Sequence, residues 1–294
     1  MTVDDIRDHF VARLDAATLV MHPFPHLLLT DALPAEVYAS VIADNPFTAN
    51  PGVRFGDPSW TSRLRFTHYY DYRFQHDLCA GSRTLDQEPW SLLGDAFDNA
   101  AWLGPTLRDR FPEYFDLRFG DIGAVEQAGV DGDGAGERGG FWGRLHTRTF
   151  LQRHEPGYQL DAHTDIPTRI ATCIFNFPPG AGYEQAGTQF LEPLDPRWRC
   201  TGNSHYPIDG FRVVASSPYA PNTGVVFFKT RHSWHAVSAE VSNVPGGRFG
   251  MQVQLYEPDD GALVDLSAPD LLRNGQFHTG IVAKLRRTVT RCRA

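Results

Sequence analysis

The chain has few lysines and cysteines, and it lacks any long hydrophobic run. Lys229 and Lys284 are the only lysines among 27 basic residues, so arginine is left to bind any anionic ligand. The net charge of -8 argues against a nucleic-acid-binding protein, because such proteins present a basic face. The four cysteines form no Cys-x-x-Cys pair, which argues against a zinc ribbon and a thioredoxin-type site.

Signals for export or membrane insertion are also lacking. No segment approaches the roughly 20 apolar residues that span a bilayer, and the first residues lack the basic and apolar regions of a secretory signal. We therefore expect a cytoplasmic protein with free thiols, in which Cys173 of an apolar segment is buried. The 294 residues, 41% of them hydrophobic, suffice for one large or two modest domains.

Helical patterns dominate the first third of the chain. Ile6, Phe10, Leu14 and Leu19 predict the apolar stripe of an amphipathic helix over residues 4–17. After it we expect a short strand (26–29), a helix with Pro34 near its first turn, a strand (63–70) and a helix over 88–112 that breaks near Gly104 and Pro105.

From about residue 115 the pattern changes to short apolar or alternating segments separated by Gly, Pro, Asn and Asp. Many short strands between turn residues indicate a sandwich or a barrel, so the predicted fold is mostly β with N-terminal helices. We expect strands within the segments 144–154, 169–177, 187–194, 211–216, 223–230, 234–241 and 248–257.

A Gly-rich segment at 129–140 has too few apolar side chains to join a core. Asp131 and Asp133 suggest a calcium loop, but Ala135 and Trp142 occupy two positions that need oxygen ligands. We therefore expect a surface loop here, near the mouth of an active site.

His163 and Asp165 lie one residue apart, just before an apolar β-branched segment. In an extended chain residues i and i+2 face the same way, so both side chains can converge on a metal ion, on a proton in transit or on solvent. A third ligand would come from His232 or His235, if a β-fold returns their strand beside the first. Two imidazoles and one carboxylate on one face of an ion are typical of non-heme Fe(II) oxygenases.

Further segments occur around these residues in a fixed order. The set consists of GYQLDAHTD (157–165), IFNFPP (174–179), GTQFLEP (187–193), NTGVVFF (222–228), SWHAV (233–237) and RFGMQVQLY (248–256). In order and spacing it resembles the Fe(II)/2-oxoglutarate-dependent dioxygenase superfamily, in its prolyl-hydroxylase-like branch. The resemblance covers roughly residues 20–45 and 90–256, and the ordered set is more specific than the His-x-Asp pair alone.

The resemblance implies a double-stranded β-helix, also called a jelly roll, which is a cupin-like core. It implies Fe(II), 2-oxoglutarate and O2, with His163, Asp165 and His235 as the iron ligands, because SWHAV matches the family's third-ligand strand. Arg248 matches the basic residue that binds the distal carboxylate of 2-oxoglutarate, and a planar guanidinium suits that bidentate pair. The implied reaction oxidises, most often hydroxylates, a substrate and releases succinate and CO2.

We expect a small-molecule, biosynthetic substrate. A helical and strand buttress (1–114), a catalytic core of the same domain (115–260) and a C-terminal extension (261–294) account for the chain and leave no second module. The acidic excess would suit a cationic substrate, no segment indicates nucleic-acid or membrane binding, and the oligomeric state is not indicated.

Two alternatives to hydroxylation remain open at this point. The same class of enzyme also performs oxidative cyclisation, desaturation and epimerisation. From another class, a non-catalytic β-barrel binding module or a cupin-like metal isomerase would share the fold.

Overall fold

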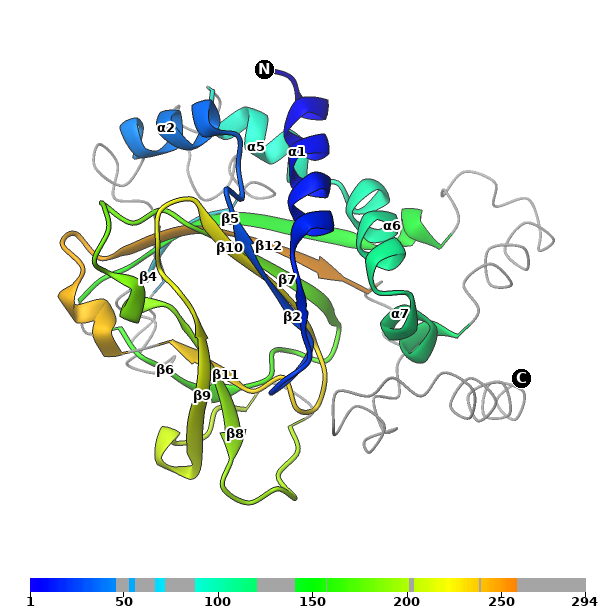
Figure 1. The fold of residues 1–294 in the computed structure, drawn as a ribbon, viewed down its shortest axis with the longest axis vertical. Helices are drawn as coiled ribbons and strands as arrows, with labels where there is room; N and C mark the ends of the chain where they lie inside the picture. The colour runs from blue at the N-terminus through cyan, green and yellow to red at the C-terminus, as the bar shows by residue number, and fades with distance from the viewer. Residues whose placement is uncertain are drawn as a thin grey trace.

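The computed structural model describes residues 1–45, 88–120, 141–156, 158–200, 204–237 and 239–257, together with the backbone of 53–55 and 67–71. Two antiparallel β-sheets face each other, and the helices lie on the outer side of the larger sheet (Figure 1). The Gly-rich segment 129–140 and the C-terminal segment 261–294 lie outside the described residues.

The larger sheet has the strand order β1-β2-β10-β7-β12-β5-β4-β3, and the smaller has the order β6-β11-β8-β9. From β5 onward the chain crosses repeatedly between the two sheets, so residues far apart in sequence become neighbours. The strands are β1 (Leu19–Val20), β2 (His26–Thr30), β3 (Val53–Phe55), β4 (Thr67–Asp71), β5 (His146–His154), β6 (Leu160–His163), β7 (Arg169–Asn176), β8 (Thr188–Pro193), β9 (Phe211–Ser217), β10 (Thr223–Phe228), β11 (His235–Val237) and β12 (Arg248–Tyr256).

The predicted strands are confirmed where the structure describes them, with one marked difference at the segment 234–241. Residues 63–66 of the predicted strand 63–70 lie outside the described residues. In the segment 234–241, β11 has three residues, and a 3₁₀ helix (Ala239–Asn243) replaces the expected continuation. The chain turns because Val241 is fully buried in a small cluster with Tyr158 and Tyr219, outside the sheet. Hydrophobic packing at this point outweighs the strand preference of the sequence.

The first helix, α1 (Val3–Ala16), begins with a capping box between Thr2 and Asp5. Its buried residues are Ile6, Phe10 and Leu14, as the apolar stripe predicted. The assignment of Leu19 to the same stripe was wrong, because the helix ends before it and Leu19 is exposed at the start of β1.

The predicted helix over 88–112 is divided at a different place from the one expected. Asn99, rather than Gly104 and Pro105, separates α5 (Trp90–Phe97) from α6 (Ala100–Arg110), because its side chain caps α6 by accepting from the backbone N–H of Trp102. Pro105 lies inside α6, which continues past it. The remaining helices are α2 (Ala35–Ala43) and α7 (Pro112–Phe119).

One hydrophobic core joins these helices to the larger sheet. Phe10 of α1 and Phe97 of α5 pack against each other and against Phe175 of β7, with ring centroids 5.0–5.8 Å apart. Each such ring contributes about 1.5–3 kcal/mol when fully buried. The expected boundary at residue 114 falls inside α7, and the division of the chain into three segments stays a prediction.

None of the helices that the structure describes has the length and apolar composition needed to cross a membrane.

Substituting alanine for Gly187 is expected to destabilise the smaller sheet. A Cβ at this position would lie 1.7 Å from the carbonyl oxygen of Ser217 on β9, so the two strands would have to separate. We expect Gly187→Ala to lower the free energy of unfolding by about 1–3 kcal/mol or more in a urea titration. Gly180→Ala is the matched control, since no heavy atom lies within 4 Å of its added Cβ. Equal effects of the two substitutions would contradict the close approach.

Candidate metal centre and its cavity

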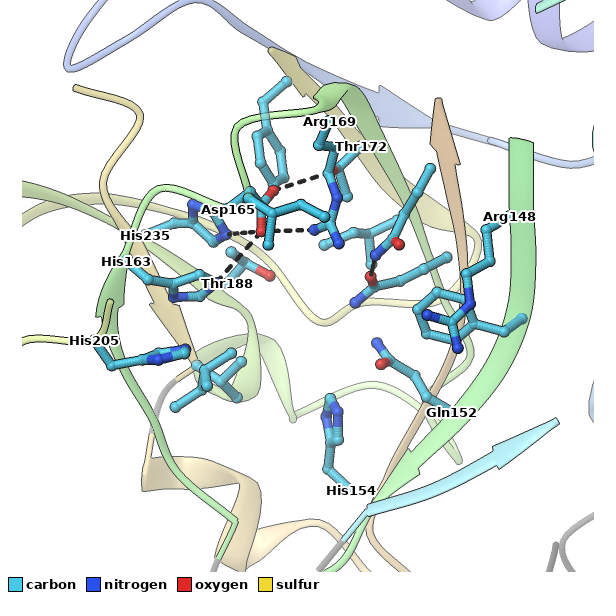
Figure 2. Close-up of a pocket in the computed structure, with 18 of the residues that line it drawn as sticks. Arg148, Gln152, His154, His163, Asp165, Arg169, Thr172, Thr188, His205 and His235 are labelled. Carbon is cyan, nitrogen blue, oxygen red and sulfur yellow. Dashed lines mark hydrogen bonds and ion pairs between the residues drawn. The ribbon is translucent and has the colours of Figure 1, made fainter. Parts of the chain in front are cut away.

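His163 and His235 lie directly opposite each other on neighbouring strands of the smaller sheet. Antiparallel pairing of β11 with β6 puts the two residues in register, as expected if the third-ligand strand returns beside the first. Together with Asp165 they form a buried group whose ligand atoms all lie within 4.8 Å of one another. Figure 2 shows the three side chains converging at one side of a cavity between the sheets.

Asp165 reaches this point by a route different from the one expected. The sequence predicted that Asp165 faces the same way as His163 because both lie in one extended strand. In the structure β6 ends at His163, and Asp165 has a φ of 66°. A non-glycine residue in the left-handed region is uncommon and costs of order 1–3 kcal/mol unless the surroundings hold it there. The turn aims Asp165 Oδ1 at both imidazoles, 3.5 Å from His163 Nε2 and 3.6 Å from His235 Nε2.

Backbone carbonyls fix the tautomer of both histidines. His163 Nδ1 lies 2.9 Å from the carbonyl oxygen of Asp161, and His235 Nδ1 lies 2.9 Å from that of Ser233. A carbonyl oxygen only accepts, so each Nδ1 carries a proton and each Nε2 faces the centre of the group. Burial, followed by the nearby His235, lowers the pKa of His163 to about 4, which keeps this ring neutral at physiological pH.

The Asp165 carboxylate is ionised despite its burial. Burial alone would raise its pKa, but the Arg169 guanidinium, with Nη1 2.7 Å from Oδ1, and then the two imidazoles hold the pKa well below its ordinary value. Thr172 of β7 donates a hydrogen bond to Oδ2 over 3.1 Å. The carboxylate is therefore oriented by the larger sheet as well as by its own turn.

The donor set fits a divalent transition metal. Two imidazoles and one carboxylate can share one ion, because metal–ligand bonds to such atoms are about 2 Å long. His232, the alternative third ligand, is partly exposed and belongs neither to this group nor to the described lining of the cavity. Trp234, which lies between His232 and His235 in the sequence, is buried away from the metal-binding group, in a cluster with Ala162 and Leu191.

The three candidate ligands open onto a cavity of about 690 Å³ between the two sheets. Arg248, at the start of β12, lines the same cavity and is 3% exposed. Figure 2 shows Gln152, His154 and Arg148 of β5 on the opposite side of this space from the metal-binding group. The cavity therefore joins all four residues that the sequence singled out.

Arg248 carries a buried charge without an ion-pair partner among the described residues. Its Nη2 donates to Thr188 Oγ1 over 3.2 Å, and its Nη1 lies 3.5 Å from His154 Nδ1. Its Nε is buried and has no hydrogen-bond partner in the described part of the chain. Burial, and then the charge of Arg248, holds the pKa of His154 well below its ordinary value, so this ring is a neutral acceptor. A buried guanidinium without an anion is costly, and such a site is suited to an anionic ligand.

Lys229, which sequence analysis did not single out, lies behind the metal-binding turn. It is 1% exposed, and its ammonium group donates to Thr164 Oγ1 over 2.7 Å and to the carbonyl oxygen of Thr230 over 2.9 Å. Thr164 stands between the two candidate ligands of the His-x-Asp pair and donates in turn to the carbonyl of Cys200. Lys229 thus holds the turn through the Thr164 hydroxyl, and only its rarity in this chain distinguished it in the sequence.

Helix α7 supports the far end of the same turn. Arg118 forms a buried ion pair with Glu257, and its Nη2 donates to the carbonyl oxygen of Pro167 over 2.9 Å. Tyr114 donates to the carbonyl oxygens of Ile170 and Lys229. The helical layer therefore fixes the polar backbone of the turn from outside the sheet.

The buried Lys229 is expected to make the stability of the metal-free protein depend on pH. Burial lowers its pKa from 10.5 to about 7, so between these values the unfolded chain holds a proton that the folded protein has released. The free energy of unfolding then rises with pH across this window, by up to about 1.4 kcal/mol per pH unit, and below pH 7 the contribution is constant.

Denaturant titrations of the wild type and Lys229→Met from pH 6 to 10 test this dependence. The difference in unfolding free energy between the two proteins should change in favour of the wild type above pH 7. Arg212→Met, which removes an exposed cation from β9, is the control and should leave the pH slope unaltered. Parallel pH profiles for the wild type and Lys229→Met would show that the lysine does not titrate in this window.

Cys173 is buried as expected, and burial raises the pKa of its thiol to about 12. Cys200 is also buried and free. These two thiols are therefore packing residues and carry no reactivity into the cavity.

No protein-family model and no curated protein sequence matches the chain. Among solved structures, a prolyl hydroxylase from Trichoplax adhaerens in complex with a hypoxia inducible factor peptide matches at 11% identity and a TM-score of 0.42, covering 90% of this chain and 94% of its own. A Pseudomonas putida prolyl-4-hydroxylase matches at 13% identity and 0.41, covering 86% of this chain and 98% of its own.

A third solved structure, the non-heme alpha ketoglutarate dependent epimerase SnoN from nogalamycin biosynthesis, matches at 13% identity and a TM-score of 0.39, covering 93% of this chain and 96% of its own. Similarity this low does not establish a shared activity.

Proposed function

We propose that this protein is an Fe(II)- and 2-oxoglutarate-dependent oxygenase, with His163, Asp165 and His235 as the iron ligands and Arg248 as the partner of 2-oxoglutarate. One observation carries the proposal. A buried group of two imidazoles and a carboxylate shares a cavity with a buried guanidinium that has no ion-pair partner among the described residues. The first set suits a non-heme iron, and the second suits the distal carboxylate of the cosubstrate.

The strand order supports a jelly roll as the fold of this proposal. Strands β5, β12, β7 and β10 are consecutive neighbours in the larger sheet, and β6, β11, β8 and β9 make up the smaller one. Eight antiparallel strands divided between two sheets in this way are typical of a double-stranded β-helix. We extend the proposal to the prolyl-hydroxylase-like branch on the ordered sequence segments.

When bound, iron and 2-oxoglutarate supply the oxidising chemistry with O2 and release succinate and CO2. The chain itself supplies the buried side chains that orient the two groups. The carbonyl oxygens of Asp161 and Ser233 hold the two imidazoles by their Nδ1 protons, and Thr172 holds the carboxylate. Thr188 and His154 set the direction of the Arg248 side chain.

A small-molecule substrate fits the size of the site. The cavity of about 690 Å³ lies within the range of roughly 300–1,000 Å³ that is usual for small-ligand sites. Hydroxylation is the proposed outcome, and cyclisation, desaturation and epimerisation are other outcomes of the same class. A biosynthetic role is part of the proposal.

Anaerobic addition of 2-oxoglutarate to the Fe(II)-loaded protein tests the proposal. We expect a weak visible charge-transfer band, and we expect succinate to form after O2 is admitted. A protein that binds Fe(II) but yields neither the band nor succinate would instead belong with the cupin-like isomerases or the binding modules.

A further inference from the structure

The register of the larger sheet links the metal-binding group to an arginine across the cavity. Phe227, Thr172, Gln254 and Arg148 are paired in one row that crosses β10, β7, β12 and β5. At one end of the row, the Phe227 ring packs on His235 with centroids 4.7 Å apart, and Thr172 bonds to Asp165. Arg148 forms the other end, about 10 Å from Thr172 at two strand spacings.

A hydrogen-bond chain along this wall runs in one direction. Arg169 can only donate, and its Nη2 bonds to the Tyr256 hydroxyl over 3.0 Å. Tyr256 then donates to Gln254 Oε1, and Gln254 Nε2 donates to Gln252 Oε1 over 2.8 Å. The direction fixes both glutamine amides, so their remaining N–H groups are donors on the wall of the cavity.

The lining of the cavity has an excess of positive charge. Among the described residues that line it, Arg148, Arg169 and Arg248 are cationic, whereas Asp165 is the only carboxylate. Asp165 is already paired with Arg169 and is needed for the metal. The sign of this lining is opposite to that of the whole chain, whose net charge of -8 suggested a cationic substrate.

We infer that the substrate carries a carboxylate, bound by the Arg148 guanidinium with help from the amide donors of Gln252 and Gln254. This inference rests on the proposed function and names the substrate class for the same cavity. The guanidinium of Arg148 lies over the Phe150 ring, 5.2 Å from its centroid, and Phe150 is paired with Gln252 on β12. The cation and the amide donors therefore line neighbouring strands of the same cavity wall. Figure 2 shows Arg148 across the cavity from the metal-binding group.

The cosubstrate does not account for Arg148. Gln254 of β12 is paired with Arg148 of β5. Arg248 comes six residues before Gln254, so about 20 Å of strand separates these two residues along β12. The short chain of 2-oxoglutarate, held by Arg248 at one end and directed to the metal at the other, leaves the Arg148 end of the cavity for a second molecule. The carbon to be oxidised then lies several bonds away from the substrate carboxylate.

Calorimetric titrations of the protein loaded with Mn(II) and saturated with 2-oxoglutarate test this inference. The probes are acetate, benzoate and 4-phenylbutyrate, each compared with its neutral amide. We expect at least one carboxylate to bind about tenfold or more tightly than its amide, because the pair with arginine is charge-assisted. Arg148→Gln should remove this preference and leave the affinity for 2-oxoglutarate unchanged.

A second variant and a matched control separate binding from folding. Gln254→Glu places a carboxylate opposite Arg148 on the neighbouring strand, so it should also remove the preference for carboxylates. Arg153→Gln removes the same charge from the same strand at a position outside the described lining, and it should retain the preference.

Millimolar carboxylates that fail to bind to the wild type, or a preference that survives in Arg148→Gln, would overturn the inference. Weaker 2-oxoglutarate binding in Arg148→Gln would also overturn it, since it would assign this arginine to the cosubstrate. Failure of the wild type to bind 2-oxoglutarate would count against the proposed function itself.

Discussion

Replacing Asp165 is expected to abolish metal binding and turnover. Asp165→Asn keeps the shape of the side chain but removes the only negative charge in the metal-binding group. We expect Mn(II) affinity, measured by calorimetry, to fall at least 100-fold, since even partners outside the coordination sphere are worth about 10–100-fold. Succinate production from 2-oxoglutarate should become undetectable. Asp165→Asn with wild-type metal affinity would remove Asp165 from the proposed ligand set.

Asp165→Ala is a less suitable variant, because it removes both the charge and the oxygen that accepts from the buried Arg169, whereas asparagine keeps an acceptor oxygen there. Breaking such a pair costs roughly 3–5 kcal/mol, so loss of metal binding would be confused with loss of folding. Thermal melting of the metal-free variants separates the two effects.

The choice between His235 and His232 can be tested by the same titrations. His235→Ala and His163→Ala should behave like Asp165→Asn, because each removes one imidazole from the group. His232→Ala is the matched control, three positions away and partly exposed, and should retain substantial turnover. An inactive His232→Ala together with an active His235→Ala would reverse the assignment.

Replacing Arg248 should weaken 2-oxoglutarate binding while leaving metal binding intact. Each hydrogen bond from a charged group contributes about 1.5–3 kcal/mol, and about 1.4 kcal/mol corresponds to a tenfold change in affinity. We therefore expect the KM for 2-oxoglutarate in Arg248→Met to rise by roughly 10–100-fold or more. An unchanged KM would assign the cosubstrate to another cationic residue.

The stability of the same variant distinguishes a ligand-binding arginine from a structural one. Arg248 has no ion-pair partner among the described residues, and burial lowers the pKa of its guanidinium, so its charge opposes folding of the free protein. Arg248→Met should therefore melt at the wild-type temperature or above it when 2-oxoglutarate is absent. Arg169→Met should melt lower, because it removes the partner of the buried Asp165. 2-Oxoglutarate should raise the melting temperature of the wild type and of Arg169→Met, but not that of Arg248→Met.

The local patterns of the sequence determined the secondary structure of the described core. Alternating and apolar segments predicted most strands from β5 to β12, and the spacing of Ile6, Phe10 and Leu14 predicted the buried face of α1. These predictions succeeded because side-chain direction repeats every two residues in a strand and every 3.6 in a helix, so a few neighbouring residues carry the signal. The four residues proposed for iron and 2-oxoglutarate were also selected at this level, through the ordered segments around them.

Contacts between distant residues decided what the local patterns missed. The left-handed turn at Asp165 is held by Lys229, which donates to the neighbouring Thr164, and by Arg118 of α7, and neither Lys229 nor Arg118 is near Asp165 in the sequence. The place where α5 and α6 divide depended on the cap at Asn99 rather than on the helix-breaking residues that follow.

The positive charge of the cavity lining was likewise determined by the tertiary structure. Composition reports the charge of the whole chain, which is negative, whereas the strand register selects which side chains meet between the sheets. Arg148, Arg169 and Arg248 come from three strands and line one space only because β12 lies between β5 and β7. The sequence determined that a group of metal ligands was available, and the pairing of the strands determined the charge of the cavity that the ligands face.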